Sequence, residues 1–126
     1  MRRMLSAVCA LFLMTGCQKQ TPRMTVLIGA TSIQAAGARP IEDSVIVVAA
    51  GKIRAIGERR DVPVPQNSDR VDFTGRWIVP APGSRIAPGE AANLIFLNHA
   101  PNGIEPANAS DVTSRMSNGE WIKSAP

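Results

Sequence analysis

Glycine and proline recur throughout this chain and restrict the length of any regular element. The 126 residues include ten Gly and ten Pro. Glycine costs helix stability, proline removes a backbone donor, and an isolated helix needs about a dozen residues to be stable in water. Most of the sequence leaves no stretch long enough for an ordinary helix. It therefore predicts a mainly β fold with many turns, of the β-sandwich or pseudo-barrel kind.

The first 16 residues have the pattern of a secretory signal. Two arginines follow the first methionine, and the uncharged run 4–14 is shorter than the roughly 20 residues of a membrane span. The run ends in MTGC at 14–17, which resembles the bacterial lipobox. That resemblance implies that Cys17 is lipidated and becomes the mature N-terminus. An ordinary signal peptide followed by a chance cysteine is the alternative.

Lipidation would anchor the chain and determine the state of both cysteines. Cys9 would leave with residues 1–16 and Cys17 would carry acyl chains, so no disulfide is expected. Acyl chains contribute about 0.8 kcal/mol per buried CH₂, and several of them hold a domain on a membrane. Gln18 follows the cysteine, which among lipoproteins favours the outer membrane, and residues 17–23 would form a spacer. We therefore expect a lipid-anchored protein of the bacterial cell envelope, on the periplasmic face.

Composition and charge fit one small globular domain without a nucleic-acid partner. Hydrophobic residues make up 44% of the chain and charged residues 19%. The formal net charge is +4, from 14 basic and 10 acidic residues. Loss of the two arginines in the signal would leave 12 basic against 10 acidic residues, a net charge of +2. This excess is too small to predict binding to a phosphate backbone.

Several short apolar runs predict the strands of the N-terminal part. Residues 24–28 are followed by Gly29, where the strand should bend before continuing to Ile33. The run 44–49 is apolar on both faces and should be central in its sheet. It is followed by Ala50-Gly51 and by the alternating run 52–56, which together predict a hairpin. Two prolines in 58–68 predict an extended connection.

Later runs predict further strands and two hairpins. We expect a short hairpin from strands at 70–73 and 76–79 around Thr74-Gly75. Residues 94–97 are apolar on both faces and predict a buried strand, followed by a long polar loop at 98–111. A second hairpin is predicted around Asn118-Gly119, because both residues tolerate positive φ.

Four phrases of the sequence resemble a known enzyme superfamily. IEDSVIVVAAGKIRAIG and VDFTGRWIVP resemble the N-terminal segment of the amidohydrolase superfamily, especially its imidazolonepropionase-like and dihydroorotase-like branches. SRIAPGEAANLIFLN and SRMSNGEWIK resemble its C-terminal segment. The resemblance implies a composite β-sandwich over 24–123, built from residues 24–80 and 83–123. The strand at 94–97 should then pair with N-terminal strands rather than only with its neighbours in sequence.

In that superfamily a metal-binding (β/α)₈ barrel separates the two segments, whereas here only Ala81-Pro82-Gly83 does. The barrel's His-x-His pair, its bridging carboxylated lysine or glutamate, its other histidines and its catalytic aspartate have no counterpart in this sequence. A hydrolytic zinc site needs at least three protein ligands, yet the chain has one histidine, His99, in a predicted loop. We expect a solvated His99, no metal or other cofactor and no catalytic residue.

Nucleophilic and phosphate-binding chemistry are also not indicated. A serine nucleophile would be Ser84, Ser110 or Ser114, but no G-x-S-x-G turn occurs and the sole candidate base is His99. The phrase GSRIAPG at 83–89 lacks the GK[ST] ending of a phosphate loop. The leading hypothesis is a non-catalytic, amidohydrolase-like lipoprotein domain. The alternatives are an accessory subunit of a hydrolase of non-peptide C–N bonds, with its barrel on another chain, and a structural or binding lipoprotein of the envelope.

Absence of the barrel leads to an expectation about the surface. Part of the sandwich would lie against the barrel in a full-length enzyme, so its removal should expose apolar side chains. The candidates beside the junction are Trp77, Ile78, Val79 and Ile86. We expect self-association or an envelope protein partner at such a patch. Trp77 and Trp121 are predicted to pack in the core or in this interface rather than to stack on a ligand.

Overall fold

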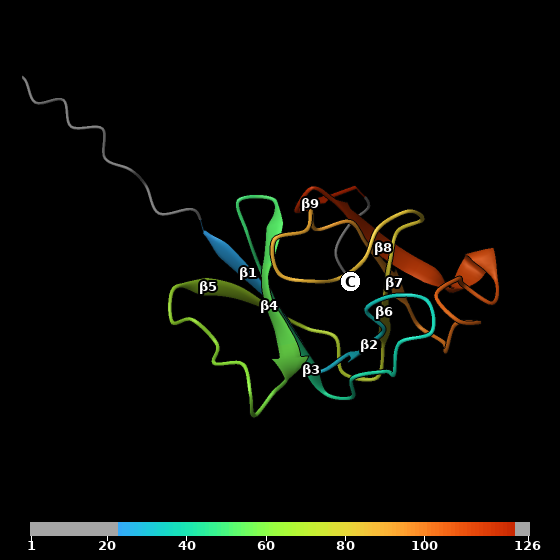
Figure 1. The fold of residues 1–126 in the computed structure, drawn as a ribbon, viewed down its shortest axis with the longest axis horizontal. Helices are drawn as coiled ribbons and strands as arrows, with labels where there is room; N and C mark the ends of the chain where they lie inside the picture. Colours follow the sequence, from blue (N-terminus) through green and yellow to red (C-terminus); the bar gives the residue numbers. More distant parts are fainter. Residues whose placement is uncertain (1–22, 123–126) are drawn as a thin grey trace, which may run out of the picture.

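The computed structural model describes residues 23–122, which form two β-sheets packed against each other (Figure 1). No α-helix occurs within these residues, so they contain no helix long and apolar enough to cross a membrane. The strands are β1 (Met24–Ile28), β2 (Thr31–Ser32), β3 (Ser44–Ala49), β4 (Lys52–Glu58), β5 (Ser68–Asp72), β6 (Trp77–Pro80), β7 (Leu94–Leu97), β8 (Val112–Ser117) and β9 (Glu120–Trp121). A single 3₁₀ turn, η1 (Ala109–Asp111), precedes β8. The predicted signal, Cys17 and most of the spacer lie outside the described residues.

The strands divide into a four-stranded and a five-stranded sheet. The first sheet has the order β4-β3-β1-β5, and the second has the order β2-β6-β7-β8-β9. β1 with β5 and β2 with β6 are parallel pairs, and the remaining pairs are antiparallel. The predicted mainly β sandwich is therefore confirmed.

Two stretches of chain cross side by side from the first sheet to the second (Figure 1). In one, β1 leads to β2 through Gly29, whose φ is +93°. In the other, β5 leads to β6 past Thr74. A Cβ on Gly29 would collide with the Thr74 side chain, so the close approach of the two crossings requires glycine at that position. The predicted bend at Gly29 is thus a change of sheet.

The prediction of a hairpin over 70–79 is wrong. β5 lies at the edge of the first sheet beside β1, and β6 lies in the second sheet between β2 and β7. Burial gives the physical reason. β5 is largely exposed, whereas Ile78 and Val79 of β6 are fully buried on opposite faces of their sheet. A strand that is covered on both faces belongs inside a sheet, not in a two-stranded surface hairpin.

The other two predicted hairpins are confirmed. β3 and β4 are joined by Ala50 and Gly51, with φ of 52° and 79°. β8 and β9 are joined by Asn118 and Gly119, with φ of 49° and 82°. Two successive residues with positive φ make the type I′ turn that matches the twist of antiparallel strands. β3 is buried along its whole length and has β4 and β1 as neighbours, so it is central as predicted.

β7 lies between β6 and β8. We predicted that this strand would pair with N-terminal strands rather than only with its neighbours in sequence. Its two partners are its neighbours in sequence, so this prediction is wrong. β6 belongs to the N-terminal part, yet it is also the strand that directly precedes β7. The second sheet is nevertheless composite, because β2 and β6 precede residue 81 and β7, β8 and β9 follow it.

The main core lies between the sheets and contains an aromatic cluster. Phe73 stacks on Phe96 with ring centroids 4.6 Å apart, and Trp121 lies 5.2 Å from Phe96 and 6.2 Å from Phe73. Offset and tilted aromatic pairs at these separations stabilise beyond the area they bury. The buried side chains around them come from both sheets, for example Leu27 and Ile46 from the first sheet. The core therefore joins the two sheets, and Trp121 packs there as predicted.

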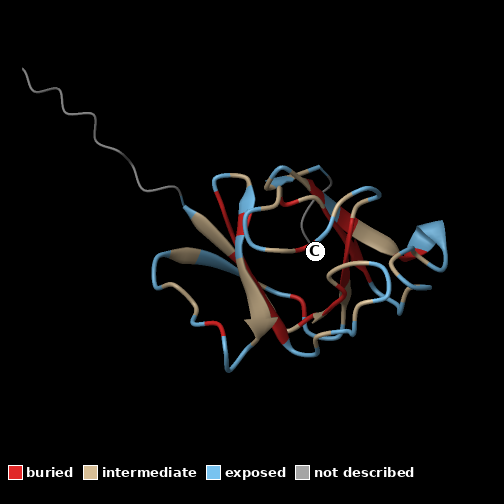
Figure 2. Cartoon of the chain, in the orientation of Figure 1, coloured by how far each residue is buried: buried red, intermediate tan, exposed pale blue. Residues whose placement is uncertain are grey.

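Each sheet also has a smaller apolar cluster on its outer face, covered by a loop. Buried residues lie along strands of both sheets and also occur in the loops between strands (Figure 2). On the first sheet, Val62 and Val64 of the proline-containing connection pack over Val45 and Val47. On the second sheet, Ile104 of the loop 98–111 packs over Val79, Ile95 and Leu97. These covers explain why β3 and β7 are apolar on both faces.

The exposed patch expected beside the junction is not formed by the predicted residues. Ile78, Val79 and Ile86 are fully buried, and Trp77 is half-buried against the outer cluster of the second sheet. Ile86 enters the main core because the Ile86 N–H donates to the Gln34 carbonyl, while the Gln34 side-chain amide donates to the Ile86 carbonyl. Among large hydrophobic side chains of the described residues, only Ile122 is exposed, at 65%.

Candidate functional site

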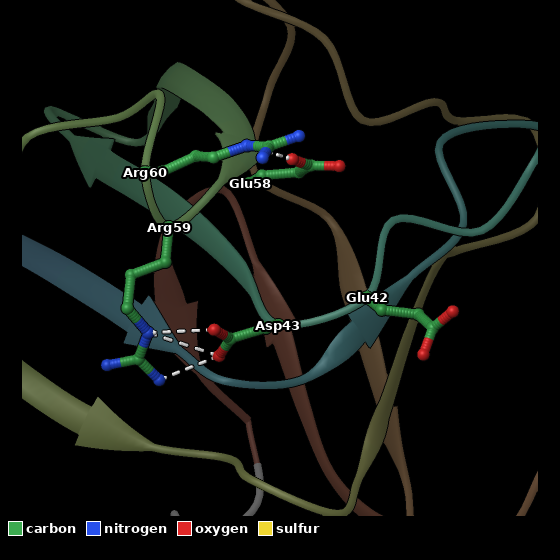
Figure 3. A pocket seen from close by; sticks show the side chains of 5 residues that line it. All are labelled: Glu42, Asp43, Glu58, Arg59 and Arg60. Carbon is green, nitrogen blue, oxygen red and sulfur yellow. Dashed lines mark hydrogen bonds and ion pairs between the residues drawn. The ribbon is translucent and has the colours of Figure 1, made fainter.

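A charged hollow lies where the β3–β4 hairpin opens away from its turn (Figure 3). Ser44 at the start of β3 faces Glu58 at the end of β4, so the residues just before β3 and just after β4 come together. The hollow has a volume of about 490 Å³. Its lining is entirely charged and consists of Glu42, Asp43, Glu58, Arg59 and Arg60.

Two ion pairs line this hollow. Arg59 donates from Nη2 to Asp43 Oδ1 at 2.7 Å and from Nε to both carboxylate oxygens at 3.1 Å. Arg60 Nε lies 2.8 Å from Glu58 Oε2. The hydrogen bonds from Arg59 hold the pKa of the Asp43 carboxyl below its ordinary value, and the same bonds raise the pKa of Arg59. Glu42 points away from these pairs (Figure 3).

The arrangement in the hollow fits a solvated set of ion pairs rather than a reaction centre. Asp43 and Arg59 side chains are 59% and 51% exposed, and exposed pairs of this kind contribute little to stability. Within residues 23–122 no three His, Cys, Asp or Glu side chains are grouped so that they could hold a metal ion.

His99 has a partner that the sequence did not indicate. Its Nδ1 lies 3.1 Å from Oδ1 of Asp111, a buried carboxylate, and 2.8 Å from Asn98 Oδ1. Asp111 also accepts from the Asn108 backbone N–H at 3.2 Å, the capping-box contact of η1. His99 itself is 71% exposed, as predicted for a loop histidine. The spacing N-x-x-D at 108–111, which is typical of a capped turn, is the one sequence signal that could have indicated the position of Asp111.

The three serines considered as nucleophiles are not brought to His99. Within the described residues none of them makes a hydrogen bond to the imidazole. Ser84 Oγ lies 3.4 Å from the Asn93 side-chain amide, and Ser114 Oγ is buried without a partner among the described residues. A histidine and a buried aspartate without a bonded nucleophile lack the third member of a hydrolytic triad.

The junction between the two parts is a tight turn with residues suited to it. The Ser84 N–H donates to the Ala81 carbonyl at 2.9 Å, and Gly83 has φ of 80°. Pro82 and Gly83 thus occupy the two central positions of a type II turn, where proline and glycine are favoured. Pro82 and Gly83 are exposed at the surface. Residues 81–93 connect β6 to β7 and begin with this turn, and Pro80 lies opposite Leu94.

A backbone clasp beyond this turn fastens the tips of both hairpins together. The Ala92 N–H donates to the Gly51 carbonyl at 2.9 Å, and the Ala92 carbonyl accepts from the Gly119 N–H at 3.1 Å. Asn93 Oδ1 accepts from the Asn118 N–H at 2.8 Å. A Cβ on Gly119 would lie only 2.7 Å from Gly51 Cα. The clasp links the β3–β4 turn of the first sheet to the β8–β9 turn of the second.

Comparison with known proteins gives only partial likenesses. No family model and no curated protein matches the sequence. Molinate hydrolase is similar in structure over 48% of this chain and 13% of its own, at 24% identity and a TM-score of 0.42. A protein described as a prolidase from Bifidobacterium longum is similar over 48% of this chain and 16% of its own, at 22% identity and a TM-score of 0.43. This chain spans less than a fifth of the length of either protein.

Proposed function

We propose that this chain is a non-catalytic, amidohydrolase-like β-sandwich module that a lipid on Cys17 anchors to the bacterial envelope. The observation that carries the proposal is the junction at residues 81–84. The parts that resemble the two ends of a much longer enzyme are joined there by a type II turn with Pro82 and Gly83 at its centre. The whole connection between β6 and β7, residues 81–93, is too short to hold a barrel.

Three features of the described residues support a self-contained module. The core between the sheets draws side chains from both parts of the chain. The outer face of each sheet is covered by a loop of the same chain. The clasp at Ala92 adds hydrogen bonds from one hairpin turn to the other. Such a module needs no barrel to bury its apolar surface.

The non-catalytic part of the proposal is tested by assay of the purified full chain. Amide, cyclic imide and lactam substrates would be supplied with Zn²⁺ or Mn²⁺, because these are the bonds and metals suggested by the resemblance. We expect hydrolysis no faster than in buffer with the same metal. Hydrolysis that the His99→Ala variant abolishes would refute the proposal, since His99 is the sole histidine of the chain.

The anchoring part is tested by metabolic labelling with a fatty acid in a bacterial host. The full chain should take up label and sediment with membranes. Cys17→Ser should lose both properties, whereas Cys9→Ser should keep them, because Cys9 would leave with the signal. Equal labelling of the two variants, or none in the unmodified chain, would contradict lipidation at Cys17.

A further inference from the structure

The chain contains two Asn-Gly dipeptides in very different surroundings. Asn102-Gly103 lies in the exposed loop 98–111, and Asn118-Gly119 forms the β8–β9 turn. Asn-Gly is the dipeptide in which a backbone nitrogen most easily reaches the preceding side-chain carbonyl, because glycine has no Cβ to hinder the approach. The surroundings of the glycine nitrogen therefore determine which asparagine is chemically labile.

Gly119 is held on all sides. Its N–H donates to the Ala92 carbonyl, and the preceding N–H of Asn118 donates to Asn93 Oδ1. The backbone of Gly51 lies so near that a Cβ built on Gly119 would meet Gly51 Cα at 2.7 Å. Attack by the Gly119 nitrogen would require these contacts to open together. Asn118 should thus react only from locally opened states of the protein.

Gly103 is free of such contacts. Within residues 23–122 its N–H has no hydrogen-bond partner, and a Cβ built on it would meet no atom within 4 Å. Asn102 and Gly103 are both exposed. The local restraints are two hydrogen bonds between the backbones of Asn102 and Glu105, at 2.8 and 3.0 Å. Loop tips of this kind are where backbone rearrangement costs least.

We infer that Asn102 is a site of spontaneous deamidation and that the clasp protects Asn118 from the same reaction. The Gly103 nitrogen forms a bond to Asn102 Cγ, the bond from Cγ to the side-chain nitrogen breaks, and ammonia leaves with the proton lost by Gly103. Water then opens the resulting succinimide at either carbonyl, which gives aspartate or isoaspartate. No oxidant, metal or enzyme is needed.

The product would alter the cover of the second sheet. Either product adds a negative charge at residue 102, close to Glu105. Isoaspartate also lengthens the backbone by one methylene, which disrupts the paired hydrogen bonds between Asn102 and Glu105. Ile104 lies between these residues and packs over the outer apolar cluster of the second sheet. Conversion to isoaspartate should therefore loosen Ile104 and lower the stability of the domain.

The test is peptide mapping by mass spectrometry after incubation of the full chain at mildly alkaline pH. In the native protein, Asn102 should convert at least about tenfold faster than Asn118, because Asn118 must first open the clasp. In concentrated urea the two rates should become similar. Asn93→Ala should speed conversion of Asn118 without changing the conversion rate of Asn102. In Asn102→Gln, Asn118 should be the remaining site and should convert slowly.

The inference fails if Asn118 converts as fast as Asn102 in the native protein. It also fails if Asn102 stays intact in the native protein over a time in which both sites react in urea. Circular dichroism of each sample would establish that the native protein and the Asn93→Ala variant are folded. Should Asn93→Ala not fold, Gly51→Ala opens the same clasp from its other side.

Discussion

Two buried serines should respond in opposite ways to the same substitution. Ser44 Oγ donates to the Ala30 carbonyl at 2.7 Å and accepts from Ser32 Oγ at 2.6 Å. Ser114 Oγ is also buried, but it has no partner among the described residues. Alanine removes one oxygen atom at either site, so the difference between the variants isolates the effect of the hydrogen bonds.

The magnitudes follow from what each oxygen contacts. Ser44→Ala removes two buried hydrogen bonds worth about 1 kcal/mol each and leaves Ser32 unpaired, so it should destabilise by about 2–4 kcal/mol. Burial of an unpaired hydroxyl costs about 1–3 kcal/mol on protein mutational scales. Ser114→Ala relieves that cost but loses some packing, so we expect a gain of about 1 kcal/mol. In a domain of this size 1 kcal/mol corresponds to a shift in Tm of about 4–8 °C.

Thermal and urea unfolding of the three proteins would measure both effects. The melting temperature should fall clearly in Ser44→Ala and rise slightly in Ser114→Ala, with the urea m-value unchanged. A loss of stability in Ser114→Ala as large as that in Ser44→Ala would refute the reasoning, because it would mean that the Ser114 hydroxyl is bonded in the folded protein.

Two further outcomes are expected. Gly119 and Gly83 have nearly the same φ, 82° and 80°, so alanine causes similar backbone strain at either position. A Cβ at 119 would also meet Gly51 Cα at 2.7 Å, whereas a Cβ at 83 would meet no atom within 4 Å. Urea unfolding should therefore show a loss of stability of about 1 kcal/mol in Gly83→Ala and a clearly larger loss in Gly119→Ala. Because Arg59 lowers the pKa of Asp43 in the folded state, the associated stability is present at neutral pH and is lost as pH falls below about 4 through the lowered pKa. The urea midpoint should fall less steeply over that pH range in Asp43→Asn.

The strands and turns that depend on local sequence could be predicted. The hairpin at 50–51 and the hairpin at 118–119 follow from residues that accept positive φ between β-forming runs. Burial of β3 and β7 on both faces also followed from their composition. These features need no knowledge of which elements meet in space.

The features that were predicted wrongly or missed are contacts between segments distant in the sequence. Residues 70–79 have the local pattern of a hairpin, but their partners are β1 for one half and β2 and β7 for the other. Ile86 lies in a stretch rich in Gly, Pro and Ala, and its burial depends on the distant backbone of Gln34. The pairing of His99 with Asp111 likewise depends on how the loop 98–111 returns to β8. Neither hydrophobic periodicity nor turn residues carry this information.

The claim on which the proposed function rests is that residues before and after the 81–84 turn form one complete domain without a barrel. Native-state hydrogen exchange tests it most directly, because it reports the opening free energy of each amide. Ile46 in β3 belongs to the first sheet and the N-terminal part, and Phe96 in β7 belongs to the second sheet and the C-terminal part. Both amides should exchange only through global unfolding, with one opening free energy that equals the value from urea unfolding. A Phe96 amide that opens at a clearly lower free energy than the Ile46 amide would contradict the claim.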